Sequence, residues 1–168
     1  MKILFLDCDG VLNCATTNFK TDLWPLDRYM AFLVGKIILD TGAKVVLSSA
    51  WRIHPEARAI VDQCVSPILD ITPHSWYDHD TEHHSTRGEE IQKWINDYSA
   101  CYPTPNDHAC CNYKIDRYAI LDDCSDMLPD QLPNFFRTSW ATGLTEKIAN
   151  QVIAHLNTPK GWVRSQGI

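Results

Sequence analysis

Two carboxylates separated by one residue, Asp7 and Asp9, directly follow an apolar run near the start of the chain. The run, residues 3–6, contains no polar residue, whereas a half-exposed strand would alternate apolar with polar side chains. We therefore predict a strand buried on both faces, as in a parallel sheet. Ligands bind at the carboxyl ends of strands in open α/β sheets, so both acids lie where chemistry is expected. The chain turns directly after the strand, so the side chains of the two acids are expected to point in different directions. We therefore predict that they have different roles.

Other segments carry polar side chains at their ends in the same way. Ala43 to Leu47 and Arg117 to Leu121 are apolar runs that each end in a polar pair, and an amphipathic helical pattern begins at residue 87. We expect these ends to converge with the first strand at one edge of one sheet. The polar residues placed there are Ser48 and Ser49, Arg87, and Asp122 and Asp123.

Carboxylates gathered at one edge repel one another, which predicts a cation that neutralises them. The motifs supply oxygen ligands and neither His nor Cys of the zinc type, so Mg²⁺ is favoured over zinc. A cation, a serine and an arginine around one acid form a pocket for a phosphoryl group.

The elements that position these residues alternate between apolar runs and helical patterns. Helices are predicted over residues 26–40, with Pro25 in the first turn and Gly42 at the exit, and over 55–64, 87–95 and 145–156, the last capped by Thr145. Further strands are predicted at 43–47, 67–71, 117–121 and 134–138. This alternation predicts an α/β fold: a single Rossmann-like, three-layer domain with a mainly parallel sheet of about five strands and right-handed connections.

Composition limits the classes of function. With 168 residues, of which 45% are hydrophobic, the chain suits one domain. The net charge of −6 argues against broad binding to nucleic acid, although a local basic groove stays open. Seven scattered cysteines favour a reducing compartment, and we expect a cytoplasmic protein. The absence of a leader-like start and of any run of about 18 apolar residues argues against secretion and membrane insertion.

On these motifs, the sequence resembles the haloacid dehalogenase (HAD) superfamily of aspartate-nucleophile phosphatases. The four matching motifs are Asp7-Cys8-Asp9-Gly10, Ser48 after Val45-Val46-Leu47, the cation Arg87, and Leu121-Asp122-Asp123. More narrowly, four phrases are similar to small, capless HAD proteins, among them the HAD domain of RNA-repair proteins. The phrases are Asp9-Gly10-Val11-Leu12-Asn13, Leu47-Ser48-Ser49-Ala50-Trp51-Arg52, Arg87-Gly88-Glu89-Glu90-Ile91 and Gly143-Leu144-Thr145.

The resemblance implies a role for each motif. Asp7 would be the nucleophile that forms an aspartyl-phosphate, and Asp9 the general acid and then the base. Ser48 and Ser49 would bind phosphoryl oxygens. Mg²⁺ would be held by the Asp7 carboxylate, the Asp9 carbonyl and Asp123, with Asp122 either a ligand or a partner of one.

Arg87 would balance charge on the nucleophile and the phosphate, a task that more HAD members give to lysine. Other cations therefore stay open for it: Lys114, Arg117 and Arg52. Asn13 and Arg52 are further candidates for substrate contact, and Arg52 could equally pack on Trp51.

Several other groups have a simpler interpretation. The loop with His79, His83, His84, Asp78 and Asp80 could hold a metal but is favoured as a solvated loop. Cys101, Cys110 and Cys111 with His108 lack the paired Cys-x-x-Cys spacing of zinc sites and are favoured as thiols. Cys8 and Trp94 are expected to pack in the core, Asp126 to cap or support, and Trp76, Tyr77 and Trp140 are candidates to line a base or sugar site.

The resulting hypothesis is a Mg²⁺-dependent phosphomonoester hydrolase acting on a nucleotide or a phosphorylated nucleic-acid end. The gaps between motifs leave no room for a large cap, so the site is open unless loops 73–86 and 99–112, or the second subunit of a homodimer, close over it. Alternatives are a phosphatase of phosphoproteins or other small metabolites, and a non-catalytic module that binds metal and phosphate. A response-regulator receiver also gathers acids, a hydroxyl and a cation at the edge of a parallel sheet. In a receiver, however, the paired acids precede the phosphoaccepting Asp, which is the reverse of the order here.

Overall fold

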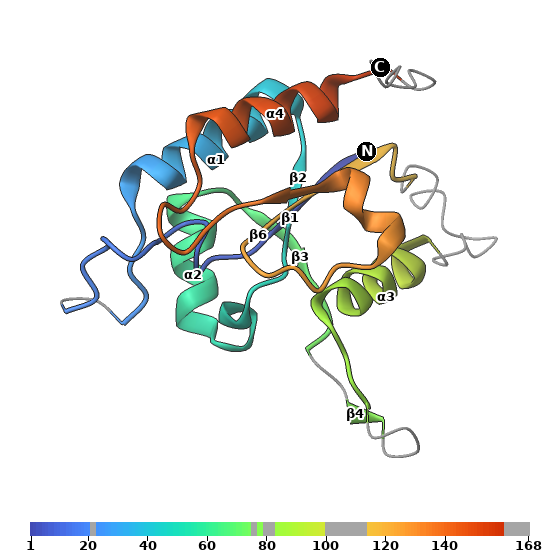
Figure 1. Cartoon of the computed structure of the whole chain (residues 1–168), viewed down its shortest axis with the longest axis horizontal. Helices are drawn as coiled ribbons and strands as arrows, with labels where there is room; N and C mark the ends of the chain where they lie inside the picture. The colour runs from blue at the N-terminus through green and yellow to red at the C-terminus, as the bar shows by residue number, and fades with distance from the viewer. Residues whose placement is uncertain (21–22, 75–76, 79–82, 100–113, 160–168) are drawn as a thin grey trace, which may run out of the picture.

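The computed structural model describes residues 1–20, 23–74, 77–78, 83–99 and 114–159. Its centre is a five-stranded sheet in the order β3-β2-β1-β6-β7, in which every neighbouring pair is parallel (Figure 1). The strands are β1 (Lys2–Leu6), β2 (Lys44–Leu47), β3 (Ile68–Ile71), β6 (Arg117–Asp122) and β7 (Phe135–Arg137). The expected α/β fold with a parallel five-stranded sheet is therefore confirmed.

Helices cover both faces of this sheet. The helices α1 (Arg28–Thr41), α2 (Pro55–Cys64) and α4 (Glu146–Asn157) contribute to the core on one face, and α3 (Arg87–Ser99) packs on the other (Figure 1). Short 3₁₀ helices, η1 (Ala50–Ile53) and η3 (Pro129–Asn134), follow β2 and β6. A hairpin of β4 (Tyr77–Asp78) and β5 (His83–His84) extends from the body where a loop was expected.

The central strand is buried on both faces, as its unbroken apolar run predicts. Leu4 and Leu6 point into the core beneath α1 and α4, while Ile3 and Phe5 point into the smaller core beneath α3. Phe5 meets Trp94 of α3 edge-on, with ring centroids 5.4 Å apart. This packing fixes α3, and so the residue at its start, against the strand that ends in Asp7.

The strand ends align at the carboxyl edge of the sheet. Leu6 is in register with Leu47 of β2 and Leu121 of β6, so the residues that follow them stand in one row. The backbone N–H of Ser48 donates to Leu6 O at 2.9 Å, and that of Asp7 donates to Leu121 O at 3.0 Å. The ladder thus continues one residue beyond the strands and places the predicted polar side chains beside one another.

The start of α1 differs from the sequence prediction. The helix begins at Arg28, because the side chain of Asp27 accepts the N–H groups of Tyr29 and Met30 and acts as the N-cap. Pro25 therefore lies before the helix, and its placement in the first turn was wrong. The predicted exit is correct, since Gly42 caps the helix with a φ of 69°.

The described helices include none that combines the length and apolar character needed to cross a membrane.

Candidate active site

Asp7 lies at the end of the central strand and is only 5% exposed. Burial, reinforced by the nearby Asp122 carboxylate, raises the pKa of Asp7 to about 7, although Arg87 and a hydrogen bond from the Ser49 hydroxyl oppose the shift. Arg87 Nη2 is 3.7 Å from Asp7 Oδ1, close enough to pair but too long for a hydrogen bond. The carboxylate is thus incompletely compensated by its protein neighbours.

Asp122, the last residue of β6, is a second buried carboxylate beside Asp7. Its Oδ1 accepts the N–H of Cys124 at 2.9 Å, and its Oδ2 is 3.2 Å from Arg87 Nε without hydrogen-bond alignment. Burial raises the pKa of Asp122 to about 6, with Arg87 opposing. One guanidinium therefore serves two buried acids, and the pair has a net negative charge when both are ionised.

Gly10 allows the first and last acidic motifs to meet. It has a φ of 74°, and a Cβ at this position would collide with the carboxylate of Asp123. The turn after β1 therefore packs closely against the loop after β6, and only glycine fits at residue 10. Any side chain at residue 10 would push Asp123 away.

Asp9 is held by two neutral donors. Asn13 Nδ2 donates to Asp9 Oδ1 at 2.8 Å, and Trp51 Nε1 donates to Asp9 Oδ2 at 3.0 Å. Trp51 lies on η1, two residues after Ser49, so the loop after β2 orients an acid of the loop after β1. Sequence reasoning missed this role of Trp51, although its position beside the serines was visible.

The hydroxyl side chains at the edge divide into two groups. Ser49 caps η1 by accepting the N–H of Trp51, and its hydroxyl also acts to lower the pKa of Asp7. The hydroxyl of Ser48 is fully buried and has no partner among the described residues, so it is a candidate to bond a ligand. Thr72 after β3 and Thr138 after β7 are also buried, and their hydroxyl groups likewise have no partner in the part of the chain that the structure describes. Sequence reasoning did not select these two residues.

Arg87 is the first residue of α3, and capping hydrogen bonds at the N-terminus of this helix fix its position. Thr86 and Glu89 form reciprocal backbone bonds, with Glu89 Oε2 accepting the N–H of Thr86 at 2.7 Å. Asp126 Oδ2 accepts the N–H of Arg87 itself at 2.9 Å, which matches the supporting role predicted for Asp126. Arg87 is thereby tied to the loop that follows Asp122 and Asp123.

The rival cations lie elsewhere. Arg117 begins β6, at the other end of the sheet, and donates to Pro159 O. Lys114 precedes that strand, and its carbonyl accepts the N-terminal ammonium group. The third rival, Arg52, bonds to carbonyl groups and to Glu90. Among the described residues, Arg87 is the cation with an ion pair to Asp7.

Asn13 and Arg52, the two candidates for substrate contact, are both buried and hydrogen-bonded within the protein. The Asn13 amide is fully buried and already bonds Asp9, Gly10 N and Pro25 O. Arg52 is 4% exposed, and both its Nη atoms donate to carbonyl groups or to Glu90. Asn13 thus holds the Asp9 carboxylate, and Arg52 holds the backbone of Ser48 and Ser49.

The acidic cluster suits a hard cation. Ligand atoms of Asp122, Asp123 and Cys124 lie within 4.8 Å of one another. Burial and the surrounding carboxylates raise the pKa of Cys124 to about 11, which disfavours the thiolate form. The donors left are carboxylate oxygens, with Asp7 beside them, and this set fits Mg²⁺ rather than zinc.

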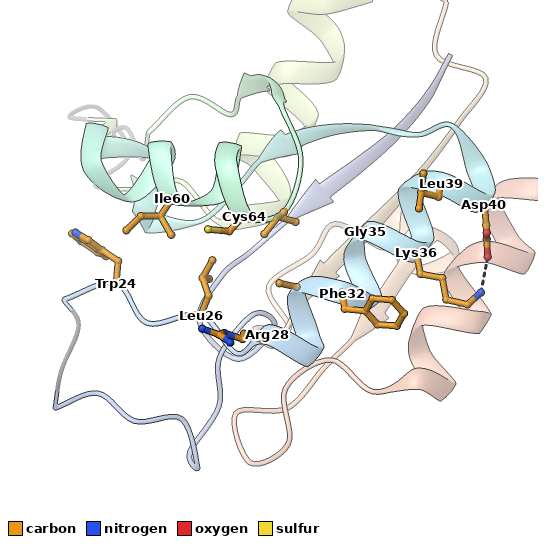
Figure 2. A pocket seen from close by; sticks show the side chains of 12 residues that line it. Trp24, Leu26, Arg28, Phe32, Gly35, Lys36, Leu39, Asp40, Ile60 and Cys64 are labelled. Atoms are coloured by element: carbon orange, nitrogen blue, oxygen red, sulfur yellow. Dashed lines mark hydrogen bonds and ion pairs between the residues drawn. The ribbon is translucent and has the colours of Figure 1, made fainter.

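A groove of about 740 Å³ lies between α1 and α2, away from these residues (Figure 2). Its walls are mainly apolar, and none of the acids, serines or arginines of the sheet edge lines it. Figure 2 shows Phe32 and Leu39 of α1 on one side and Ile60 and Cys64 of α2 on the other. The charge pattern, and not this cavity, therefore locates the candidate chemistry.

Other predicted groups can be placed only in part. Cys8 is fully buried in the core, as expected, and Trp94 is buried and donates to Asp70 Oδ2 at 2.7 Å. Trp140 is 45% exposed beside Phe19. Outside the described residues lie Trp76, His79, Asp80, Cys101, His108, Cys110 and Cys111, and Tyr77, Asp78 and His83 are described by their backbone alone.

Residues 3–149 match the protein family described as the HAD domain in Swiss Army Knife RNA repair proteins. The chain belongs to this family. The match runs from β1 into α4 and so includes every element that positions the acids, the serines and Arg87. No curated protein and no solved structure matches the chain significantly. A HAD domain indicates a phosphohydrolase type of site, in agreement with the resemblance seen in the motifs.

Proposed function

We propose that the chain is a Mg²⁺-dependent phosphomonoester hydrolase that forms a phosphoryl intermediate on Asp7. The observation that carries this proposal is the position of Asp7, a buried carboxylate at the end of the central strand and 3.7 Å from Arg87. The neighbouring strand end carries Ser48, whose buried hydroxyl has no partner among the described residues. A nucleophile, a cation and a free donor at one edge are the groups that phosphoryl transfer needs.

The chain's own residues divide the reaction into two steps. An oxygen of Asp7 attacks phosphorus, the bond from phosphorus to the leaving oxygen breaks, and Asp9 gives its proton to that oxygen. Asp9 then takes a proton from water, the water oxygen attacks phosphorus, and the bond to Asp7 breaks to release phosphate. Ser48 and Arg87 bind the phosphoryl oxygens throughout.

The acidic residues would hold the divalent ion through Asp7, Asp122, Asp123 and the carbonyl of Asp9. When bound, the ion would offset the charge of the buried acids and of the phosphoryl group. The support is the surplus of negative charge around Asp7 and Asp122, which Arg87 balances only in part.

For the substrate we propose a nucleotide or a phosphorylated nucleic-acid end. The support is the family, whose described members are RNA-repair proteins, and the lack of a cap between the described strands, which would let a large substrate approach. The competing candidates are a phosphoprotein or another small metabolite, and a module that binds without turnover.

The test is a phosphate-release assay with a nitrophenyl phosphate, a set of nucleotides, end-phosphorylated oligonucleotides and a phosphopeptide, with Mg²⁺ and with chelator. We expect release that requires Mg²⁺ and falls by on the order of a thousandfold or more in Asp7→Asn. Acid-quenched enzyme should carry labelled phosphate on Asp7. Activity that persists in Asp7→Asn or in chelator would overturn the mechanism, and the most active substrate identifies the class.

A further inference from the structure

Arg52 links three segments behind the candidate site. Its Nη1 donates to the carbonyls of Ser48 at 2.8 Å and Ser49 at 2.7 Å, and its Nη2 donates to the carbonyl of Pro73 at 3.2 Å. The same Nη2 donates to Glu90 Oε2 of α3 at 2.8 Å. The planar guanidinium therefore fixes the backbone that carries the two serines and ties it to the helix that carries Arg87.

Glu90 connects this guanidinium to the one that faces Asp7. Its Oε2 lies 2.8 Å from Arg52 Nη2 and 3.3 Å from Arg87 Nη1. With Nη1 of Arg87 engaged by Glu90, the Nη2 and Nε atoms are the ones directed at Asp7 and Asp122, at 3.7 Å and 3.2 Å. A planar group held at one nitrogen can present the other two in only a narrow range of directions.

Stability alone does not account for burying these charges. Arg52 and Glu90 are each 4% exposed. Removing a charged pair from water offsets much of its mutual attraction, and apolar residues of similar size often stabilise a core equally well. What apolar residues could not do is hold two serine carbonyls and the Arg87 guanidinium in one fixed arrangement.

We propose that Arg52 and Glu90 are positioning residues. They hold the Arg87 guanidinium and the Ser48-Ser49 backbone in fixed positions around Asp7. The proposal deepens the proposed function and rests on it. Neither residue touches the phosphoryl group; both act through residues that do.

The first test compares Glu90→Gln with the parent chain. Glutamine keeps the shape but loses the charge that holds both arginines. We expect kcat/KM for phosphate release to fall by about tenfold to a hundredfold, because a small misplacement of a catalytic group has effects of this size. The affinity for inorganic phosphate in the presence of Mg²⁺, measured by calorimetry, should fall in parallel. Asp97→Asn removes one charge from the exposed side of α3 and should keep both values close to those of the parent.

A double-mutant cycle separates positioning from a general structural effect. If Glu90 acts in part through Arg87, then adding Glu90→Gln to Arg87→Ala should lower kcat/KM clearly less than it does in the parent chain, because one of the two arginines it holds is gone. Loss of the same size in both backgrounds would overturn the proposal. So would parent-like kinetics and phosphate affinity in Glu90→Gln.

Arg52→Lys keeps a positive charge but lacks the fork that spans Glu90 and the carbonyls. We expect it to fold, as judged by circular dichroism, and to lose activity without recovery by added salt or Mg²⁺; parent-like activity would contradict a positioning role for Arg52. The outcomes distinguish the two proposals. If the parent chain binds phosphate without hydrolysing phosphate esters, the proposed reaction is wrong, and the double-mutant cycle can still be measured as phosphate affinity by calorimetry. If the parent chain hydrolyses them and the mutant effects are additive, only the positioning proposal is wrong.

Discussion

The two neutral donors on Asp9 bear directly on its proposed proton transfers. Each carboxylate oxygen offers two acceptor positions, and Asn13 and Trp51 use one on each. A position stays free on both oxygens, so Asp9 can carry a proton while its orientation is kept. The donors therefore fix the direction of the carboxyl group without occupying the place of the proton.

Trp51→Phe removes the indole N–H and keeps most of the ring. We expect kcat for alkyl phosphates to fall by about tenfold or more, because a poor leaving oxygen needs the proton of a well-aimed acid. For a nitrophenyl phosphate, whose leaving group is stable as an anion, the fall should be clearly smaller. Steady-state rates with both substrates check this.

The matched control is Trp94→Phe, which removes an indole bond from α3 to Asp70 of β3. It should lower stability without separating the two substrate classes. An equal loss on alkyl and nitrophenyl phosphates in Trp51→Phe would show that Trp51 does not act through proton transfer.

At the scale of elements, the site depends on how closely α3 docks on the loop after β6. Gly88 makes this contact: its carbonyl accepts from Gln131 Nε2 at 2.8 Å, and a Cβ at residue 88 would lie 2.5 Å from Leu128 N. Gly35 is also helical, in the middle of α1, but nothing lies within 4 Å of its Cβ position. The two helix glycines thus have opposite packing environments.

The same substitution should therefore have opposite effects at these glycines. Gly35→Ala is expected to raise the free energy of unfolding by up to about 1 kcal/mol, because alanine is the better helix former and meets open space. Gly88→Ala should lower it, and should also lower activity by shifting Arg87. Urea unfolding of both variants measures the difference. Destabilisation by Gly35→Ala would mean that its surroundings are more crowded than the structure shows.

Sequence patterns predicted the elements well where local physics decides them. The apolar run of β1 could belong only to a strand buried on both faces, and the Asp-Asp pair after β6 had to share its edge. The start of α1 was misplaced by Pro25, because a proline and a capping aspartate two residues later give competing signals.

The supporting contacts of the site could not be predicted in the same way. Trp51 and Asp9 are 42 positions apart, and Arg52 and Glu90 are 38 apart. Their pairing depends on the exact packing of η1 and α3, and no periodicity in the chain encodes that. Arg52 was selected for its position after the serines, but its carbonyl partners belong to the folded backbone alone.

For the whole molecule, the main consequence of the buried acids is a dependence of stability on pH. The folded chain raises the pKa of Asp7 to about 7 and of Asp122 to about 6, whereas the reference value is 3.8. Between these values the folded state binds more protons than the unfolded state, so stability falls as pH rises. Their contribution is complete below about pH 4 and is lost through about pH 7.

In chelator, the free energy of unfolding should decline between about pH 4 and about pH 7, and Mg²⁺ should restore stability more at the upper end. Urea unfolding across this range measures it. Asp7→Asn, which removes one titrating acid, should flatten the chelator profile. A parent profile that matches Asp7→Asn at every pH would contradict the raised pKa of Asp7.

The hydrogen bond from Trp51 to Asp9 also places a fluorescent side chain in the candidate site. The indole that donates to Asp9 packs against Trp24, with ring centroids 5.2 Å apart, so its surroundings combine an aromatic neighbour with a carboxylate whose charge changes during the proposed reaction. The fluorescence of Trp51, isolated by comparison with Trp51→Phe, is therefore a built-in reporter of the protonation and contacts of Asp9, readable in the unlabelled chain.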